Sequence, residues 1–247
     1  MICNNILEAI GNTPLIRINK LNPNPNVELY AKVEGFNPTG SIKDRVALML
    51  IEEAEKDGRL TKDKIIIEAT SGNTGIGLAM IGKLKGYKVV VVMSEAVSVE
   101  RRRMIAAFGA EVVLTHASEG TDGAIRRVAE LCAEDPDKYF NPNQFNNPAN
   151  QLAHVKTTAE EIWKQTDGKI THFVGALGTS GTLMGVGQGL KGHNPEIEIV
   201  EAHPEQGHYI QGLKNMQEAI VPKIYRPDQI DQSIIVESEE AFECARR

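Results

Sequence analysis

The chain has 247 residues, of which 41% are hydrophobic and 24% charged, a composition typical of a soluble globular protein with a sizeable core. Its formal net charge of −6 gives no electrostatic attraction to nucleic acid or to an acidic membrane surface, and its apolar runs are too short to cross a bilayer. Three widely spaced cysteines, Cys3, Cys132 and Cys244, argue against a disulfide framework and a zinc site, so we expect a cytoplasmic protein without a metal.

Short apolar strands alternate with helical patterns along nearly the whole chain. Residues 28–34 alternate like a strand, and apolar residues recur at helical spacing after residue 43. Further strands are predicted at 64–68, 88–93, 111–115, 170–176, 196–202 and 233–236, and helices at 73–85, 98–108, 121–133 and 148–165, from 181 and from 238. Apolar strands separated by helices predict an α/β fold of doubly wound parallel sheets with helices on both faces.

A polar, asparagine-rich stretch at 141–150 is the predicted domain boundary, and a second crossing is predicted near 35–37. We therefore expect two lobes. The larger consists of residues 1–35 plus 147–247, and the smaller of residues 36–146.

Lys43 stands where a turn meets a helix. Asn37, Pro38 and Gly40 break the chain just before it. In the first turn of a helix, free N–H groups and the macrodipole disfavour an added positive charge, which lowers the pKa of an amine. Such an amine suits Schiff-base chemistry, although the same position is ordinary for a solvated surface lysine.

The segment Thr70-Ser71-Gly72-Asn73-Thr74-Gly75 joins a predicted strand to a predicted helix. Backbone N–H groups at such a helix start bind anions, and the three hydroxyls add donors suited to a carboxylate. Gly75 and Gly77 also suggest a dinucleotide-binding fingerprint and hence a nicotinamide-dependent dehydrogenase. Met80 occupies the place of the third glycine, however, which disfavours that alternative.

The segment Gly178-Thr179-Ser180-Gly181-Thr182 repeats this arrangement later in the chain, because it follows the strand 170–176 and precedes a helix. Closely spaced Gly, Ser and Thr let amides and hydroxyls surround a phosphate. It is not a Walker loop, because no Gly-Lys-Ser/Thr ending is present. Two anion-binding loops predict a ligand with two anionic ends, such as a cofactor phosphate and an amino-acid carboxylate.

Together these motifs resemble cysteine synthase, the O-acetylserine sulfhydrylase branch of the fold-type-II pyridoxal-phosphate enzymes, whose fold is like that of tryptophan synthase β. The resemblance runs from about Ile6 to the end of the chain, and details such as Gln144-Phe145-Asn146-Asn147-Pro148 favour the B isozyme type. The motifs that carry it are Asn12-Thr13-Pro14-Leu15, the lysine segment 37–45, Thr70-Ser71-Gly72-Asn73-Thr74-Gly75, Gln144-Phe145 and Gly178-Thr179-x-Gly181-Thr182.

The resemblance implies a role for each matching residue. Lys43 would form the internal aldimine with pyridoxal 5'-phosphate and then act as the base at Cα, and Asn73 would bind the hydroxyl oxygen of the cofactor ring. Gly178, Thr179, Ser180, Gly181 and Thr182 would hold the cofactor phosphate. Thr70, Ser71, Gly72, Thr74 and Gln144 would bind the substrate carboxylate.

The reaction implied is β-replacement, forming L-cysteine from O-acetyl-L-serine and sulfide via an aminoacrylate, in a homodimer. The alternatives are synthesis of cystathionine, lanthionine or diaminopropionate, or a truncated, non-catalytic fragment. The last follows because family members continue beyond Arg247 into a segment whose serine binds the pyridine nitrogen. His208 and Lys214, in the loop 207–215, are weighed as contacts to the incoming nucleophile, against a solvated loop.

Overall fold

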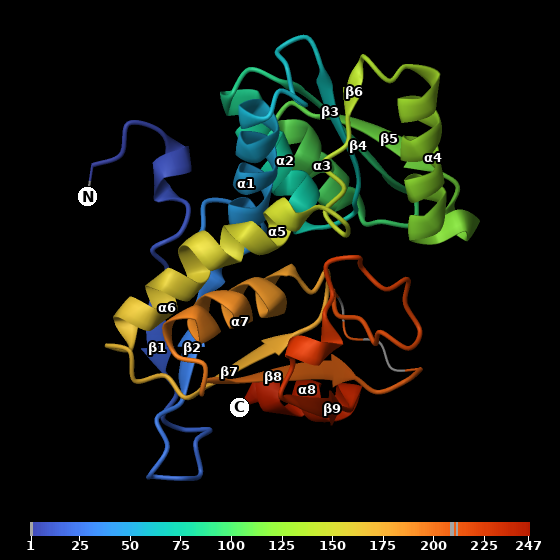
Figure 1. The fold of residues 1–247 in the computed structure, drawn as a ribbon. Helices are drawn as coiled ribbons and strands as arrows, with labels where there is room; N and C mark the ends of the chain where they lie inside the picture. The colour runs from blue at the N-terminus through green and yellow to red at the C-terminus, as the bar shows by residue number, and fades with distance from the viewer. Residues whose placement is uncertain (1, 208–209, 211) are drawn as a thin grey trace. The chain divides into compact units, whose positions relative to one another are not determined.

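The computed structural model describes residues 2–207, 210 and 212–247, which form two compact units (Figure 1). The first unit contains Met1–Ile10 and Asn37–Ala149, and the second contains Gly11–Phe36 and Asn150–Arg247. Leu7 and Ile10 pack against the core of the first unit, although the sequence analysis assigned residues 1–35 to the other lobe. The functional division into two lobes stays a prediction.

The first unit is built on a parallel sheet in the order β5-β4-β3-β6. Its strands are β3 (Ile65–Ala69), β4 (Lys88–Ser94), β5 (Glu111–Thr115) and β6 (Tyr139–Phe140). Its helices are η1 (Ile6–Ala9), α1 (Lys43–Lys56), α2 (Asn73–Leu84), α3 (Val99–Ala107), η3 (Ala117–Glu119) and α4 (Gly120–Glu134). Parallel strands separated by helices confirm the predicted fold class.

The central residues of β4 are all apolar because both faces of this strand are buried. Successive side chains of a strand point to opposite faces. Val91 and Met93 pack into the cluster that includes residues of α1, α2 and α3, while Val90 and Val92 pack with residues of α4. Both faces of the sheet are therefore covered by helices, as Figure 1 shows for this unit.

The second unit has a parallel sheet in the order β7-β8-β9 and an antiparallel pair, β1 with β2. Leu183 and Leu190 of α7 pack with Ile197 and Ile199 to form its core. Its strands are β1 (Leu15–Arg17), β2 (Tyr30–Lys32), β7 (His172–Ala176), β8 (Glu198–Pro204) and β9 (Gln232–Val236). Its helices are η2 (Glu34–Phe36), η4 (His154–Thr158), α6 (Ala159–Gln165), α7 (Gly181–His193), η5 (Pro227–Gln229) and α8 (Ser238–Arg246), while α5 (Pro148–Ala153) begins at the boundary of the units.

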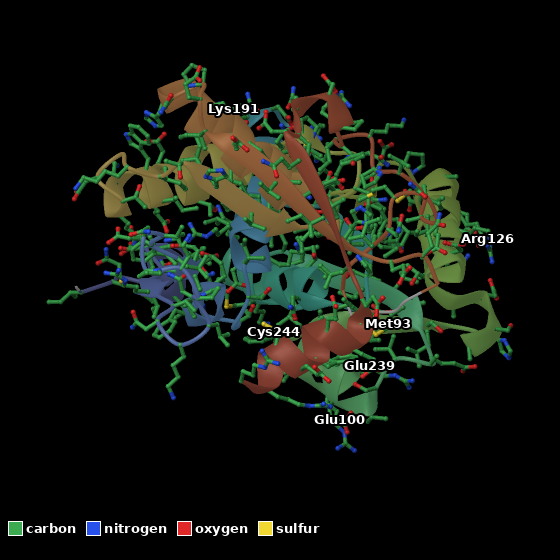
Figure 2. All side chains as sticks on the ribbon, turned by 90° about the horizontal axis from the view of Figure 1, so that it is seen from below. Met93, Glu100, Arg126, Lys191, Glu239 and Cys244 are labelled. Atoms are coloured by element: carbon green, nitrogen blue, oxygen red, sulfur yellow. The ribbon has the colours of Figure 1, made fainter. Side chains whose placement is uncertain are left out.

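Most predicted elements are present within two residues of their predicted ends, and the differences are short or irregular. The sequence analysis missed β1 and β6, which are too short for a period to be recognised. It predicted one helix over 148–165, where η4 is a π-helical segment between α5 and α6. The three cysteines are free, and Cys244 lies on α8, where it is exposed (Figure 2).

Candidate functional site

The turn before Lys43 is tied to the first turn of α1. The carboxylate of Asp44 is fully buried and accepts both the N–H of Thr39, at 2.7 Å, and the Thr39 hydroxyl. Gly40 has a φ of 79°, which glycine adopts without steric penalty. Lys43 donates its N–H to Ser41 Oγ at 3.2 Å and is the first residue of α1, as the sequence predicted.

The amine of Lys43 has a lowered pKa. Its side chain is half-buried, and desolvation disfavours the charged form, so the pKa falls below the ordinary value of 10.5. The sequence analysis expected the same direction from the helix N-terminus, whereas the structure gives burial as the cause. A larger neutral fraction makes the amine a better nucleophile and base.

The loop that follows β3 is shaped by hydroxyl groups. Thr70 is buried, and its Oγ1 accepts the N–H of Gly72 at 3.2 Å. Gly72 precedes α2, which begins at the exposed residue Asn73. The carbonyl of Ser71 accepts a hydrogen bond from Arg101, at 3.2 Å. The loop therefore presents the start of α2 together with side-chain donors.

Gln144 is brought to this loop from far along the sequence. The hydroxyl of Thr74 donates to Gln144 Oε1 at 2.6 Å, and both side chains are buried. Because Oε1 accepts this bond, the orientation of the carboxamide is fixed and its NH₂ group is the end that can donate to a carboxylate. The structure thus joins two of the residues that the sequence analysis assigned to the substrate carboxylate.

Gly75 and Gly77 are needed for helix packing in this structure. A Cβ at Gly77 would lie 3.1 Å from the Cβ of Ala47 on α1, and one at Gly75 would lie 3.2 Å from Val91 on β4. Both glycines lie within α2. Their spacing is explained by the close approach of α2 to α1 and the sheet, without a dinucleotide.

The loop from Gly178 to Thr182 has little room for larger residues. A Cβ at Gly181 would lie 2.1 Å from Asn150 Oδ1, and one at Gly178 would lie 2.9 Å from the carbonyl oxygen of Gly212. Ser180 precedes α7 with a φ of 65° and is 2% exposed. Its Oγ has no hydrogen-bond partner among the described residues. A buried hydroxyl without a partner at a helix start suits an anionic ligand.

Asn150 and His154 support this second loop, and the sequence analysis missed both. Asn150 donates from Nδ2 to Thr179 Oγ1 at 3.0 Å, and His154 Nε2 lies 3.2 Å from Thr182 Oγ1. His154 is fully buried, and its Nδ1 lies 2.9 Å from Thr158 Oγ1. A helical pattern gives no signal for such roles, although the asparagine-rich start of this segment was noted.

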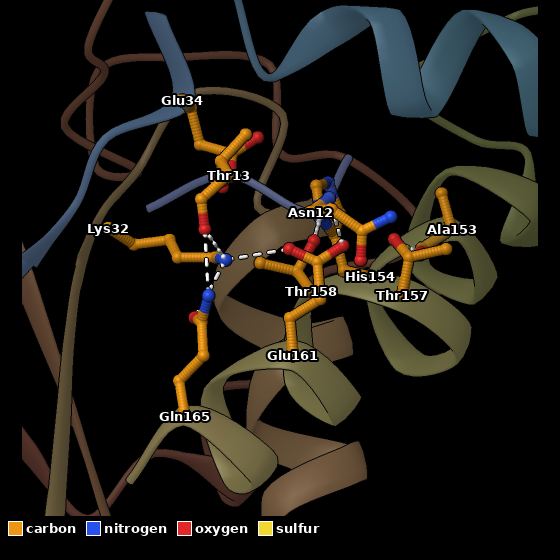
Figure 3. A network of polar contacts seen from close by, with 10 residues as sticks. All are labelled: Asn12, Thr13, Lys32, Glu34, Ala153, His154, Thr157, Thr158, Glu161 and Gln165. Carbon is orange, nitrogen blue, oxygen red and sulfur yellow. Dashed lines mark hydrogen bonds and ion pairs between the residues drawn. The ribbon is translucent and has the colours of Figure 1, made fainter. Parts of the chain in front are cut away.

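Lys32 connects the start of the second unit to α6, as Figure 3 shows. Its ammonium group lies 2.6 Å from Glu161 Oε2 and donates to the carbonyl of Thr13 at 2.7 Å. Glu161 also accepts the N–H of Asn12 at 2.9 Å, and the Thr13 hydroxyl donates to Glu34 at 2.6 Å. The segment Asn12-Thr13 is thus held by polar contacts, most of them partly buried, which gives its polar residues a structural role.

Of the two residues in 207–215 that the sequence analysis weighed as contacts to a nucleophile, the structure describes only Lys214. His208 lies outside the described residues. Lys214 donates its N–H to the carbonyl of Leu177 at 2.7 Å, so its backbone lies against the second loop. A contact of either side chain with a nucleophile stays a prediction.

No group of three or more His, Cys, Asp or Glu side chains among the described residues could hold a metal ion. None of the helices in this part of the chain is both long and apolar enough to cross a membrane.

Comparison with known proteins gives consistent matches. Residues 6–247 match the family described as pyridoxal-phosphate dependent enzyme. The chain is 48% identical over 245 residues to cysteine synthase of Aquifex aeolicus, covering 98% of this chain and 75% of that protein. It is 42% identical to cysteine synthase B of Salmonella typhimurium, covering 98% of this chain and 80% of that protein.

The chain is also similar to a solved structure. The crystal structure of cysteine synthase from Entamoeba histolytica superposes with a TM-score of 0.94 at 41% identity, and the match covers 100% of this chain and 76% of that one.

Proposed function

Since the chain belongs to the family of pyridoxal-phosphate-dependent enzymes, we propose that it forms L-cysteine from O-acetyl-L-serine and sulfide. The observation that carries the proposal is Lys43, a half-buried lysine at the start of α1 whose pKa desolvation lowers. The relatives named cysteine synthase support the choice of substrates.

The residues present fit the cofactor. Ser180 Oγ is buried and without a partner among the described residues, and a Cβ would not fit at Gly178 or Gly181. Both features suit a phosphate, which needs donors and close approach of the backbone. Gly178, Thr179, Ser180, Gly181 and Thr182 would hold it.

When bound, pyridoxal phosphate supplies an electron sink that makes the Cα–H of an amino acid acidic. Lys43 would carry the cofactor at rest, and its released amine would take the Cα proton of the substrate. Asn73, at the start of α2, would donate to the hydroxyl oxygen of the cofactor ring. These roles use an amine with a lowered pKa and an exposed carboxamide.

The loop after β3 would bind the substrate carboxylate. Thr70 and Ser71 would supply hydroxyl donors and Thr74 its backbone N–H at the start of α2, directly after Gly72, and the NH₂ group of Gln144 would supply another donor. A fixed carboxylate holds Cα at a constant place relative to the amine that removes its proton.

The experiment is an assay of cysteine formation from O-acetyl-L-serine and sulfide, combined with the absorbance spectrum of the purified holoenzyme. The wild type should form cysteine and show the visible band of a lysine-bound cofactor. Lys43→Ala should lose both, whereas Lys56→Ala should keep both, because the Lys56 side chain is 75% exposed at the end of the same helix. A Lys43→Ala protein with normal turnover would contradict the proposal.

We also propose that the protein works as a homodimer in the cytoplasm. Its free cysteines suit a reducing compartment, and the sequence resemblance supports the dimer. Light scattering of the purified protein should give twice the 27.0 kDa chain mass, and a monomer would contradict this assignment.

A further inference from the structure

Glu68 is a buried carboxylic acid that the roles described so far do not use. It lies in β3, two residues before Thr70, and is 4% exposed. Buried carboxyl groups are rare unless they are paired or hydrogen-bonded. The position of Glu68, just before the loop proposed to bind the substrate carboxylate, therefore needs an explanation.

The carboxyl group of Glu68 contacts the backbone that carries Gln144. It accepts hydrogen bonds from the N–H groups of Asn143 and Gln144, and from that of Ala69. Asn143 has a left-handed φ of 52°, and its N–H is also accepted by Asn141 Oδ1 at 2.9 Å. A turn in this strained conformation needs contacts that hold it.

The register of the sheet explains why the two segments meet. Ile65 pairs with Tyr139 and Ile66 with Phe140, so β6 ends while β3 continues toward Glu68. The chain after β6 therefore turns beside the carboxyl end of β3. A side chain on β3 is well placed to accept N–H groups that no longer have a strand partner.

Glu68 carries a proton at neutral pH. Burial raises its pKa from 4.5 to about 8, despite the three N–H groups that favour the charged form. Among the residues that the structure describes, no charged side chain contributes to this pKa; burial and, to a smaller extent, Glu68 raise the pKa of the Cys132 thiol on α4. A protonated carboxyl adds no negative charge near a loop that binds carboxylates.

The backbone and the side chain of Gln144 are therefore held by residues of two different elements. Its backbone N–H is held by Glu68 on β3, and its Oε1 by the hydroxyl of Thr74 on α2. Oε2 of Glu68 has no hydrogen-bond partner among the described residues, so the N–H groups act on this carboxyl group through Oε1.

We propose that Glu68 is a positioning residue of the carboxylate-binding loop, whose carboxyl group holds the Asn143–Gln144 backbone so that the Gln144 carboxamide, oriented by Thr74, meets the substrate carboxylate. The proposal rests on the proposed function for the identity of that substrate. Glu68 touches neither substrate nor cofactor in this account.

Two variants of Glu68 separate its possible roles. Glu68→Gln keeps an oxygen acceptor and the shape of the protonated acid, whereas Glu68→Met keeps the length and removes the acceptor. In Glu68→Met holoenzyme we expect KM for O-acetyl-L-serine to rise about tenfold, with kcat changed less than about threefold. Glu68→Gln should stay within about twofold of the wild type in both constants.

Ile67→Val is the matched control, because Ile67 is the preceding residue of β3, is fully buried and packs in the cluster with α4. It should lower stability without changing KM. A folded Glu68→Met enzyme with unchanged KM, or with a loss confined to kcat, would overturn the proposal.

Amide hydrogen exchange gives a readout that does not depend on turnover. Residues 141–146 should exchange faster in Glu68→Met than in the wild type, Glu68→Gln or Ile67→Val. If the wild type makes no cysteine, the proposed function fails while this measurement still decides whether Glu68 holds the turn. Equal exchange in all four proteins would overturn the proposal.

If Glu68→Met does not fold, Glu68→Leu takes its place, because it also removes the acceptor and its side chain is no longer than that of the glutamate. Residues 141–146 should then exchange faster in Glu68→Leu than in the wild type, and equal exchange would overturn the proposal.

Discussion

The two loops that we propose to bind anions follow the same plan, strand then loop then helix, yet they are held in different ways. The loop 178–182 is fixed by lack of space, since Gly181 leaves no room for a Cβ beside Asn150. The loop 70–74 is fixed by side-chain hydrogen bonds, such as that from Thr74 to Gln144. Adding a methyl group to the loop 178–182 should therefore cause a large loss of stability and of phosphate binding. Removing one hydrogen bond from the loop 70–74 should reduce the affinity for a carboxylate only by the contribution of that bond.

The largest expected effect is a pH dependence of stability that arises in the first unit. The pKa of Glu68 is about 8 in the folded protein and 4.5 as its ordinary value, so only the unfolded state is ionised between these values. The stabilising contribution is complete below pH 4.5 and is lost as pH rises through 8, which amounts to about 5 kcal/mol in all and to about 4 kcal/mol between pH 5 and pH 9. Urea unfolding at pH 5 and pH 9 should show this loss in the wild type and not in Glu68→Gln. Parallel pH profiles would contradict it.

Gly181→Ala tests the spatial constraint in the second unit. Its Cβ would lie 2.1 Å from Asn150 Oδ1, and moving Asn150 breaks the bond to Thr179 Oγ1. We expect a loss of about 3 kcal/mol in the free energy of unfolding and poor retention of the cofactor. The control is Gly192→Ala in the same helix, where nothing lies within 4 Å of the new Cβ. It should stabilise the protein by up to about 1 kcal/mol. Equal stability of the two variants would show that the loop has room.

Thr74→Val tests the hydrogen-bonded loop with little change in shape. It removes the donor to Gln144 Oε1, and affinity for the substrate carboxylate should fall about tenfold, or about 1.4 kcal/mol. In a double-mutant cycle with Gln144→Met, the two losses should be coupled rather than additive. Additive losses in KM would mean that the two side chains act independently.

Ser180→Gly should have the smallest effect, with opposite signs on two quantities. A residue other than glycine at a φ of 65° is strained by about 1 kcal/mol, so the cofactor-free protein should become slightly more stable. Loss of the buried Oγ should weaken cofactor binding a few-fold, because a phosphate donor is removed. Thermal unfolding of the cofactor-free protein and equilibrium dialysis measure the two effects. Tighter cofactor binding in the variant would contradict the role given to Ser180.

The features that the sequence predicts well are local ones. The apolar run at 88–93 predicts a strand of a sheet covered on both faces, and Asn37, Pro38 and Gly40 place Lys43 at a helix start. These patterns are readable because strand burial and turn conformation depend on neighbouring residues.

The features that the sequence does not predict depend on contacts between distant segments. Glu68 meets the backbone of Asn143 and Gln144, and His154 meets Thr182, through the folding of the chain. The cause of the lowered Lys43 pKa also follows from burial, which the sequence does not give. The bond between Thr74 and Gln144 joins residues 70 positions apart. That Thr74 and Gln144 both serve to bind the substrate carboxylate was inferred from the family resemblance and stays a proposal.

The proposal that Lys43 carries the cofactor is tested most directly by locating the modified lysine. The holoenzyme is reduced with borohydride, which makes the bond between cofactor and lysine permanent, and is then digested and mapped by mass spectrometry. The added cofactor mass should lie on the peptide that contains Lys43 and on no other lysine peptide. Cofactor attached to a different lysine, or to none in a protein that makes cysteine, would contradict the proposal.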